Sequence, residues 1–326
     1  SLFIYLIIRY IRLRKYSDLL SNLIRINTNE IEAQRGNVSS FASGAEFQDP
    51  SHAFANDLEL FGDNSLFQHI NRTSTYAGKN QLANWLLNPL SSKEDIESRQ
   101  KSIHELRNMV SWRQRFTATG YHIEPEEYKD TQLISWSKEK PSIGSNPMFR
   151  VSRWLLPVFT LTLLVLFFAG ILPVGYLLVM LAVNLLVLRR VSGKVTSQHN
   201  RVTKQIPTLR NYSLLFRHIE TAAFQSEGLI QVRKQFYSDH EPASKSIRKL
   251  SRISDALDSR FNPFVGILLN LFFLWDIHQV IRLEKWHNHH AGHIEKWLAA
   301  LGSLDAFISL SNFSYNNEDF NFPEIS

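Results

Sequence analysis

Apolar residues recur along this chain at intervals of three and four, the spacing of one face of an α-helix. From residue 195 to residue 223 the successive intervals are 7, 4, 3, 3, 4, 3 and 4. This pattern predicts a long helix with one packed stripe. Pro207 should kink this helix or begin a second one, because proline removes a backbone hydrogen bond. The stripe consists of Val195, Val202, Ile206, Leu209, Tyr212, Phe216, Ile219 and Ala223.

A second long helix is predicted to begin at Pro263, with Asn262 as its N-cap. Its first half, residues 264–275, is nearly all apolar and too short to span a bilayer, so we expect it to be buried on all sides. Its second half has apolar intervals of 4, 3, 4, 3 and 4, which is typical of paired long helices. That stripe consists of His290, Ile294, Trp297, Leu301, Leu304 and Ile308. The periodicity as a whole predicts an all-α fold.

The most apolar stretch, residues 154–188, contains 35 residues without Asp, Glu, Lys, Arg or His. As one helix it would be about 52 Å long, whereas the hydrocarbon core of a bilayer is about 30 Å thick. Gly170, Pro173 and Gly175 at its middle predict a turn, and therefore a two-pass transmembrane hairpin. Asn184 should face the partner arm rather than lipid. A buried hairpin of a water-soluble protein is the alternative.

Basic residues flank both ends of this stretch, which predicts that both ends lie in the cytoplasm. They are Arg150, Arg153, Arg189, Arg190 and Lys194. The chain also opens with an apolar run, Leu2 to Ile8, that basic residues follow. Seven residues cannot span a bilayer, so this run is either the end of a membrane helix or a buried or interfacial amphipathic helix. A polar helix over 17–34 and a loop or linker over 36–50 should follow.

Three shorter helices are predicted between residues 57 and 108. The first apolar face consists of Leu58, Phe61, Leu66, Phe67 and Ile70. Hydroxyl groups from Thr73 to Thr75 are suited to begin the second helix, which Pro89 should end. Ser91 or Ser92 should cap the third helix. Trp85 and Leu86 of the second helix should be buried against the third.

The same stretch follows the pattern S-L-(apolar)-x-x-(I/L)-N-x-T-x-T-x-x-G-x-x-x-L-x-x-W-L-x-x-P-L, and then I-x-x-R-x-x-x-(apolar)-x-x-L. This pattern resembles the core domain of the MutS family of DNA mismatch repair proteins. That family usually has arginine two residues after the glycine, where this chain has Asn80. The matching residues are Ser65, Leu66, Phe67, Ile70, Asn71, Thr73, Thr75, Gly78, Leu82, Trp85, Leu86, Pro89, Leu90, Ile96, Arg99 and Leu106.

The resemblance implies a MutS core-type helical bundle whose long lever helices, here 195–223 and 263–301, lead into an ATPase domain. It also implies that the closing run, residues 305–325, precedes that domain, so we expect this chain to be part of a longer protein. Five segments are expected: the end of a membrane helix with its basic flank (1–16), a helix and linker (17–50), the core helices (51–150), the inserted hairpin (151–192), and the core and lever helices (193–326).

The sequence contains no G-x-x-x-x-G-K-[ST] phosphate loop, so this chain is not expected to hydrolyse ATP by itself. The resemblance implies that a following domain binds ATP and Mg²⁺ and pairs two copies into a homodimer. The absence of cysteine excludes disulfides and thiolate metal sites. The net charge of +6 permits contact with nucleic acid or anionic lipid without requiring either.

Four histidines, at positions 287, 289, 290 and 293, raise the possibility of a metal site, since His289 and His293 would share a helix face. No carboxylate with HExxH spacing accompanies them, and a solvated helix face is the expected interpretation. The acidic pairs Glu124–Glu126 and Glu318–Asp319 lie in loop-like sequence and are not expected to be catalytic. No catalytic, cofactor or metal residue is therefore predicted.

Double-stranded DNA is a partner by resemblance, and the basic residues that could contact phosphate groups are Arg72, Lys79, Arg99, Lys101 and Arg107. However, the Phe-x-Glu motif with which the family reads mismatches does not precede the core, and the apolar hairpin lies where the core would continue towards a DNA clamp. Two hypotheses remain. One is the core and lever region of a mismatch repair ATPase held at the cytoplasmic face of a bacterial inner membrane. The other is a membrane-anchored MutS-derived scaffold that moves a membrane or protein partner and does not repair mismatches.

Overall fold

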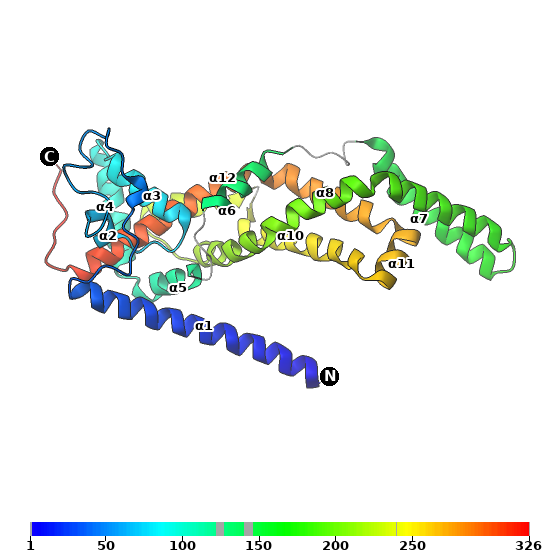
Figure 1. Ribbon diagram of the computed structural model, residues 1–326, viewed down its shortest axis with the longest axis horizontal. Coiled ribbons are helices and arrows are strands. Elements are labelled where there is room, and N and C mark those ends of the chain that lie inside the picture. Colours follow the sequence, from blue (N-terminus) through cyan, green and yellow to red (C-terminus); the bar gives the residue numbers. More distant parts are fainter. Residues whose placement is uncertain (1, 122–126, 140–145, 239, 326) are drawn as a thin grey trace. The chain divides into compact units, whose positions relative to one another are not determined.

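The fold is all-α, as predicted. The computed structural model describes residues 2–121, 127–139, 146–238 and 240–325 (Figure 1). Within these ranges the strands are limited to one short antiparallel pair, in which Tyr237 lies opposite Pro242. In chain order the elements are α1 (Leu2–Gln34), η1 (Ala45–Phe47), α2 (Leu66–Ile70), α3 (Tyr76–Leu87), α4 (Lys93–Arg107), α5 (Val110–Gly120), α6 (Glu127–Ser137), α7 (Pro147–Phe168), α8 (Val174–Glu220), α9 (Glu227–Lys234), β1 (Tyr237–Ser238), β2 (Glu241–Pro242), α10 (Ala243–Asp258), η2 (Ser259–Phe261), α11 (Pro263–Phe273) and α12 (Trp275–Asn316).

The chain folds into two compact units. The first unit contains residues 1–130, 214–243 and 295–326, and the second contains residues 131–213 and 244–294. Helices α8 and α12 each contribute residues to both units.

The core of the first unit forms around the C-terminal part of α12. Phe67 of α2 and Leu82 of α3 are fully buried and belong to one cluster with Ala306 of α12. The Trp85 ring packs edge-on against Phe307, with 4.8 Å between their centroids. Helix α1 packs along α5 (Figure 1). Helix α4 packs against α9.

The second unit contains the predicted apolar hairpin. Helices α7 and α8 run antiparallel, and the turn between them includes Gly170 with φ of 72° (Figure 1). Asn184 is fully buried and its Nδ2 donates to Thr160 Oγ1 of α7 at 2.9 Å, so it faces the partner arm as predicted. By length and composition both helices could cross a membrane. Between residues 154 and 188 most of the apolar side chains are exposed, including Trp154 and Phe168, which does not fit the alternative of a hairpin buried within a soluble protein.

Helix α8 is longer than predicted. It joins the second hairpin arm to the stripe that begins at Val195, and it continues across Pro207, which is exposed. The prediction that a second helix could begin at this proline was therefore wrong. The helix ends at Glu220, so that Ala222 is buried in place of the predicted Ala223.

The last predicted helix is broken in two. Asn262 caps α11 as predicted, because its Oδ1 accepts hydrogen bonds from the amides of Phe264 and Val265. However, Leu274 adopts a left-handed conformation with φ of 50°, and α12 leaves at 80° to α11. The expectation that this apolar half is buried on all sides was also wrong, since the Phe264 side chain is 82% exposed.

Several predictions of burial near the core were also wrong. Leu58 and Leu66 are exposed, whereas the other members of the first apolar face are buried. Leu86 is half-buried and packs on the cluster of α2, α3 and α12. The segment predicted as a loop or linker over 36–50 is irregular except for η1, and its Val38 and Phe41 side chains are buried within the first unit.

Candidate functional site

The segment Asn71–Gly78 forms a turn that begins α3. The Asn71 Oδ1 atom accepts hydrogen bonds from the amide and the hydroxyl of Thr73, at 3.1 and 2.7 Å. The Thr75 hydroxyl then accepts a hydrogen bond from the amide of Gly78 at 3.0 Å, which is an N-cap interaction. The residues of the sequence motif thus first serve to fix the start of α3.

Asp305 of α12 binds the same turn. Its Oδ2 atom accepts hydrogen bonds from the amides of Ser74 (2.9 Å) and Thr75 (2.8 Å) and from the Thr75 hydroxyl (2.7 Å). Its Oδ1 atom accepts a longer hydrogen bond, of 3.4 Å, from the Ser74 hydroxyl. Two amides at a helix N-terminus are suited to bind an anion, and here the protein's own carboxylate occupies them.

Burial of Asp305 is complete and has an electrostatic cost. Desolvation raises the pKa of this carboxyl group from 3.8 to about 6, although the hydrogen bonds from Ser74 and Thr75 act in the opposite direction. The side chain is therefore ionised at neutral pH but takes up a proton in mildly acidic solution.

Two glycines allow α3 and α12 to approach closely. A Cβ atom at Gly78 would lie 2.2 Å from Asp305 Oδ2, and one at Gly302 would lie 2.6 Å from the carbonyl oxygen of Ala77. Real Cβ atoms essentially never make such contacts. The glycine of the motif is thus required because the buried carboxylate packs directly against it.

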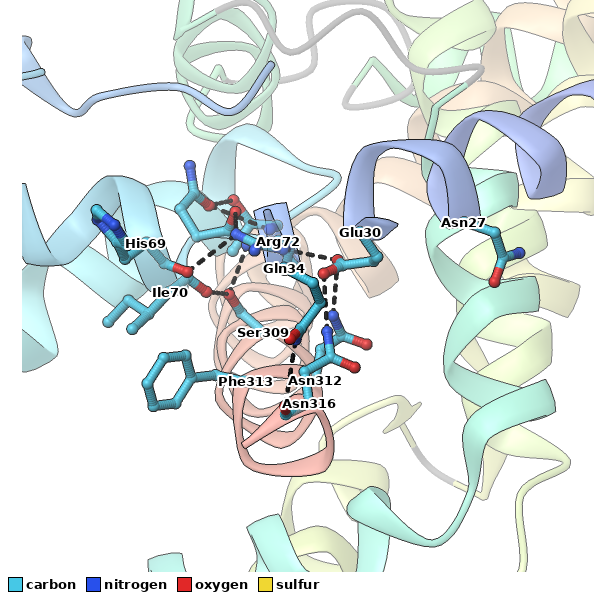
Figure 2. A network of polar contacts seen from close by, with 12 residues as sticks. Asn27, Glu30, Gln34, His69, Ile70, Arg72, Ser309, Asn312, Phe313 and Asn316 are labelled. Carbon is cyan, nitrogen blue, oxygen red and sulfur yellow. Dashed lines mark hydrogen bonds and ion pairs between the residues drawn. The ribbon is translucent and has the colours of Figure 1, made fainter. Parts of the chain in front are cut away.

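A second polar network joins α1, the turn before α3, and α12 (Figure 2). Glu30 Oε1 accepts hydrogen bonds from Arg72 Nε at 2.6 Å and from Asn312 Nδ2 at 2.7 Å, and its Oε2 accepts one from Asn316. The Ser309 hydroxyl donates to the Ile70 carbonyl and accepts from the Arg72 amide, both at 2.7 Å. The C-terminal part of α12 is therefore held by both α1 and the motif turn.

Arg113 extends these contacts to α5. It is 2% exposed, and it donates to the carbonyl groups of Leu106 and Arg107 and to Asn312 Oδ1. Burial lowers its pKa to about 10, which leaves it charged at neutral pH. Neither Arg113 nor Asp305 was predicted as a site residue. For Asp305 a signal did exist, because it lies between Leu301 and Ile308 on an apolar helix face.

Another carboxylate fixes a second helix start in the same unit. The Glu105 side chain on α4 accepts hydrogen bonds from the amides of Gln225 (2.7 Å) and Ser226 (2.6 Å), just before α9. A Cβ atom at Gly228 would lie 2.5 Å from the Ser102 hydroxyl of α4. The starts of α3 and α9 thus share two features: a carboxylate that accepts hydrogen bonds from backbone amides, and a glycine at which a Cβ atom would clash with the neighbouring helix.

The structure places the five candidate DNA-contact residues in different environments. The Arg72 guanidinium pairs with Glu30 and lies 3.6 Å from the centre of the Phe41 ring. Lys79 pairs with Glu46, and Arg99 is half-buried over the Trp85 ring. Arg107 is half-buried and Lys101 is exposed. Phosphate contact by these residues stays a prediction, and Lys101 is the one whose charge is most available for it.

Two pockets of the first unit adjoin these residues. A cavity of about 610 Å³ lies at the start of α3 and is lined by Arg25, Asn29, Ser40, Phe41, Ala42, Asn71, Thr73, Ser74, Thr75, Lys79 and Tyr121. The backbone amides of Ser74 and Thr75, two residues that line this cavity, already donate hydrogen bonds to Asp305. A groove of about 820 Å³ is lined by Gln100, Lys101, His104, Glu105, Asn108, Met109, Ala223, Gln225, Ser226 and Phe322.

Two of the four histidines of α12 lie close to backbone carbonyl groups. The His287 Nε2 atom lies 3.0 Å from the Trp136 carbonyl oxygen, and His289 Nδ1 lies 2.7 Å from that of Lys285. In the part of the chain that the structure describes, no group of three His, Cys, Asp or Glu residues could hold a metal ion. Glu318 and Asp319 are exposed after α12, while the pair Glu124–Glu126 lies outside the described residues.

Comparisons with known proteins point to the same segment. Residues 53–124 match the protein family described as MutS domain III. Over 106 residues the chain is 31% identical to the DNA mismatch repair protein MSH6 of Saccharomyces cerevisiae, and this alignment covers 32% of the chain and 8% of the relative. The chain thus spans only a small part of the length of that relative. No solved structure matches significantly. These findings support a MutS-family core domain at this position.

Proposed function

We propose that this chain is the core and lever region of a MutS-like mismatch repair protein held at a membrane. In this proposal a following ATPase domain binds ATP and Mg²⁺ and forms a homodimer, and α8 and α12 transmit its nucleotide-dependent movements. The partner whose binding these movements control is double-stranded DNA. The match to MutS domain III and the similarity to a mismatch repair protein support this function.

The observation that carries the proposal is the attachment of α12 to the start of α3 by Asp305. The carboxylate accepts three hydrogen bonds shorter than 3 Å from Ser74 and Thr75, in a fully buried position. Gly78 and Gly302 leave no space between the two helices for independent sliding. A shift of α12 along its axis would either break these hydrogen bonds or move α3 with it. That rigid attachment is what a mechanical element requires.

The membrane attachment is supported by the hairpin of α7 and α8. Its exposed apolar side chains and its lack of charge between residues 154 and 188 suit lipid, and each arm satisfies its backbone within its own helix. Basic residues at both ends favour the cytoplasmic face of a bacterial inner membrane.

A scaffold that moves a protein or membrane partner without repairing DNA is the second candidate. One observation favours it: Arg72, Lys79 and Arg99 are engaged by acidic or aromatic groups of the protein itself. Charges used internally in this way contribute little to phosphate binding.

A salt titration of DNA binding separates the two candidates. The protein, with all domains present and in detergent, is mixed with labelled duplexes with and without one mismatch, and anisotropy is recorded at increasing salt. For the repair function we expect salt-dependent binding that is tighter for the mismatch. Lys101→Ala should reduce affinity and lower the salt slope by about 1, as for one lost phosphate contact. Lys285→Ala, at an exposed position of α12, is the matched control and should change neither quantity.

The absence of binding at low salt would reject the DNA partner and leave the scaffold. Equal binding to both duplexes would reject mismatch recognition. An unchanged salt slope in Lys101→Ala would remove this residue from the interface.

The membrane part of the proposal has its own test. Single cysteines are introduced as Ile171→Cys in the hairpin turn and as Ser192→Cys within the basic flank of α8; residues 1–326 contain no cysteine of their own. In intact cells an impermeant thiol reagent should label the first variant and not the second. The opposite pattern would reverse the orientation, and protein that stays in the aqueous phase without detergent would reject membrane insertion.

A further inference from the structure

Helix α11 has an unusual surface for a short helix. No charged residue occurs from Phe261 to Trp275. The side chains of Phe264, Ile267 and Leu268 are 82%, 59% and 57% exposed. Single exposed apolar side chains are normal, but a contiguous apolar patch of this kind marks an interaction surface.

The α11 surface is continuous with that of the hairpin. Helix α11 packs against α7, and the buried Asn184 side chain of α8 joins all three helices. Its Nδ2 atom donates to Thr160 Oγ1 of α7 at 2.9 Å and to the Leu271 carbonyl oxygen of α11 at 2.7 Å. Hydrogen bonds from one buried amide to two neighbours are typical of helices that associate in lipid.

The residues that flank α11 on its two sides contact each other. The Arg260 guanidinium, just before α11, pairs with the Asp276 carboxylate just after it, with 3.5 Å between Nε and Oδ2. The left-handed Leu274 turns the chain by 80° between these residues. The Asn270 side chain accepts a hydrogen bond from the Asp276 amide at 3.0 Å and stabilises this bend. The 11 residues of α11 measure about 16 Å, which is too short to span a hydrocarbon core of about 30 Å.

We propose that α11 is a third membrane-embedded helix, which lies in the interfacial layer of the lipid at the base of the α7–α8 hairpin, so that the chain leaves α11 on the side of the membrane from which it entered. The proposal rests on membrane insertion of the hairpin, proposed above. Lipid acyl chains are the occupant of the α11 surface, because this surface lacks charge and continues the lipid-facing surface of α7. The Arg260–Asp276 pair then lies at the level of the headgroups.

Polar and aromatic groups at the base of α7 are consistent with this depth. The Trp154 ring packs edge-on against His278, with 4.8 Å between centroids, and His278 Nε2 lies 2.8 Å from the Arg153 carbonyl oxygen. Tryptophan next to basic residues is typical of a membrane interface. Since His278 follows Asp276 by two residues, the start of α12 lies at the same interface as the start of the apolar part of α7.

Fluorescence quenching by lipids tests the proposal directly. The full chain carries a single NBD-labelled cysteine from Leu268→Cys in α11, Val165→Cys in the hairpin, or Lys285→Cys on the exposed face of α12. Each variant is reconstituted into phosphatidylcholine–phosphatidylglycerol vesicles with spin-labelled lipid, whose nitroxide is either near the headgroup or near the chain end. Leu268, Val165 and Lys285 are all exposed in the structure, so labelling should not disturb packing.

We expect the Leu268→Cys label to lose emission mainly with the shallow nitroxide, and the Val165→Cys label mainly with the deep one. The Lys285→Cys label should lose little emission with either. An α11 label that behaves like the Lys285→Cys label, while the Val165→Cys label is quenched, would overturn the inference and leave the hairpin standing. An unquenched Val165→Cys label would reject the hairpin and, with it, the inference. The same labels at Ile267 should repeat the Leu268 result, which guards against local misfolding of one variant.

Discussion

Replacement of Asp305 is the most informative perturbation of the first unit. In Asp305→Ala the amides of Ser74 and Thr75 lose their acceptor and stay buried at the start of α3. An unsatisfied buried donor costs about 1–3 kcal/mol, so two of them should lower the free energy of unfolding by roughly 2–6 kcal/mol. Asp305→Asn retains one carbonyl oxygen for these amides and removes the charge, so it should cost clearly less.

The raised pKa of Asp305 predicts that the stability of the natural protein depends on pH in a way that the stability of Asp305→Asn does not. Its folded-state pKa of about 6 exceeds the ordinary value of 3.8, so between these pH values the folded protein binds more protons than the unfolded chain. The stabilising contribution of the protonated form is complete below pH 3.8 and is lost as the pH rises through about 6. A shift of this size corresponds to about 3 kcal/mol at 1.36 kcal/mol per pKa unit. Relative to Asp305→Asn, the natural protein should therefore lose about 3 kcal/mol between pH 3 and pH 7.

Urea unfolding at a series of pH values measures these differences, and hydrogen exchange locates them. The amides of Ser74 and Thr75 should exchange faster in Asp305→Ala than in Asp305→Asn, while those of α10 in the second unit should not change. If Asp305→Asn is as unstable as Asp305→Ala, acceptance of these two hydrogen bonds is not what Asp305 contributes. If the difference between Asp305→Asn and the natural protein does not depend on pH, the electrostatic reasoning is wrong.

Three further substitutions test the packing of the same unit. Gly78→Ala should lower the free energy of unfolding by about 1–3 kcal/mol through overpacking against the buried carboxylate, whereas Gly292→Ala, which has no neighbour within 4 Å, should not destabilise. Ser92→Ala should cost about 1 kcal/mol because the Ser92 hydroxyl accepts a hydrogen bond from the first turn of α4, and Ser91→Ala should cost much less. Leu82→Ala should cost about 2–5 kcal/mol, since the side chain is fully buried. Urea unfolding of each variant provides the comparison, and equal effects within either pair would contradict the contacts described.

Much of the local structure could be predicted because its signals lie within a few residues. The caps Thr75, Ser92 and Asn262 each bind an amide two or three residues ahead, and short polar side chains before an apolar run reveal them. The turn at Gly170 and the orientation of Asn184 followed from the length of the apolar stretch and from the cost of a polar group in lipid.

The predictions were wrong where contacts between residues distant in sequence determine the conformation or the burial of a segment. The break at Leu274 has no local signal, because leucine rarely adopts positive φ, and the bend is stabilised by Asn270 and by the Arg260–Asp276 pair. Without that break, the apolar α11 was interpreted as the buried half of one long helix. Leu66 is exposed because the short helix α2 presents only one face to the core, whereas the exposed Leu58 lies in the turns before that helix.

The Asp305 site shows how a sequence motif and a distant residue depend on each other. Thr75 and Gly78 suffice to begin α3, and any sequence with this spacing could do so locally. What requires a glycine rather than an alanine at position 78 is the carboxylate more than two hundred residues later, whose Oδ2 atom would lie 2.2 Å from the added carbon. An acidic residue on the apolar face of a helix cannot be accommodated without donors. A glycine close behind a Thr cap marks a helix start that such a residue can approach, so the two features together predict the contact that neither predicts alone.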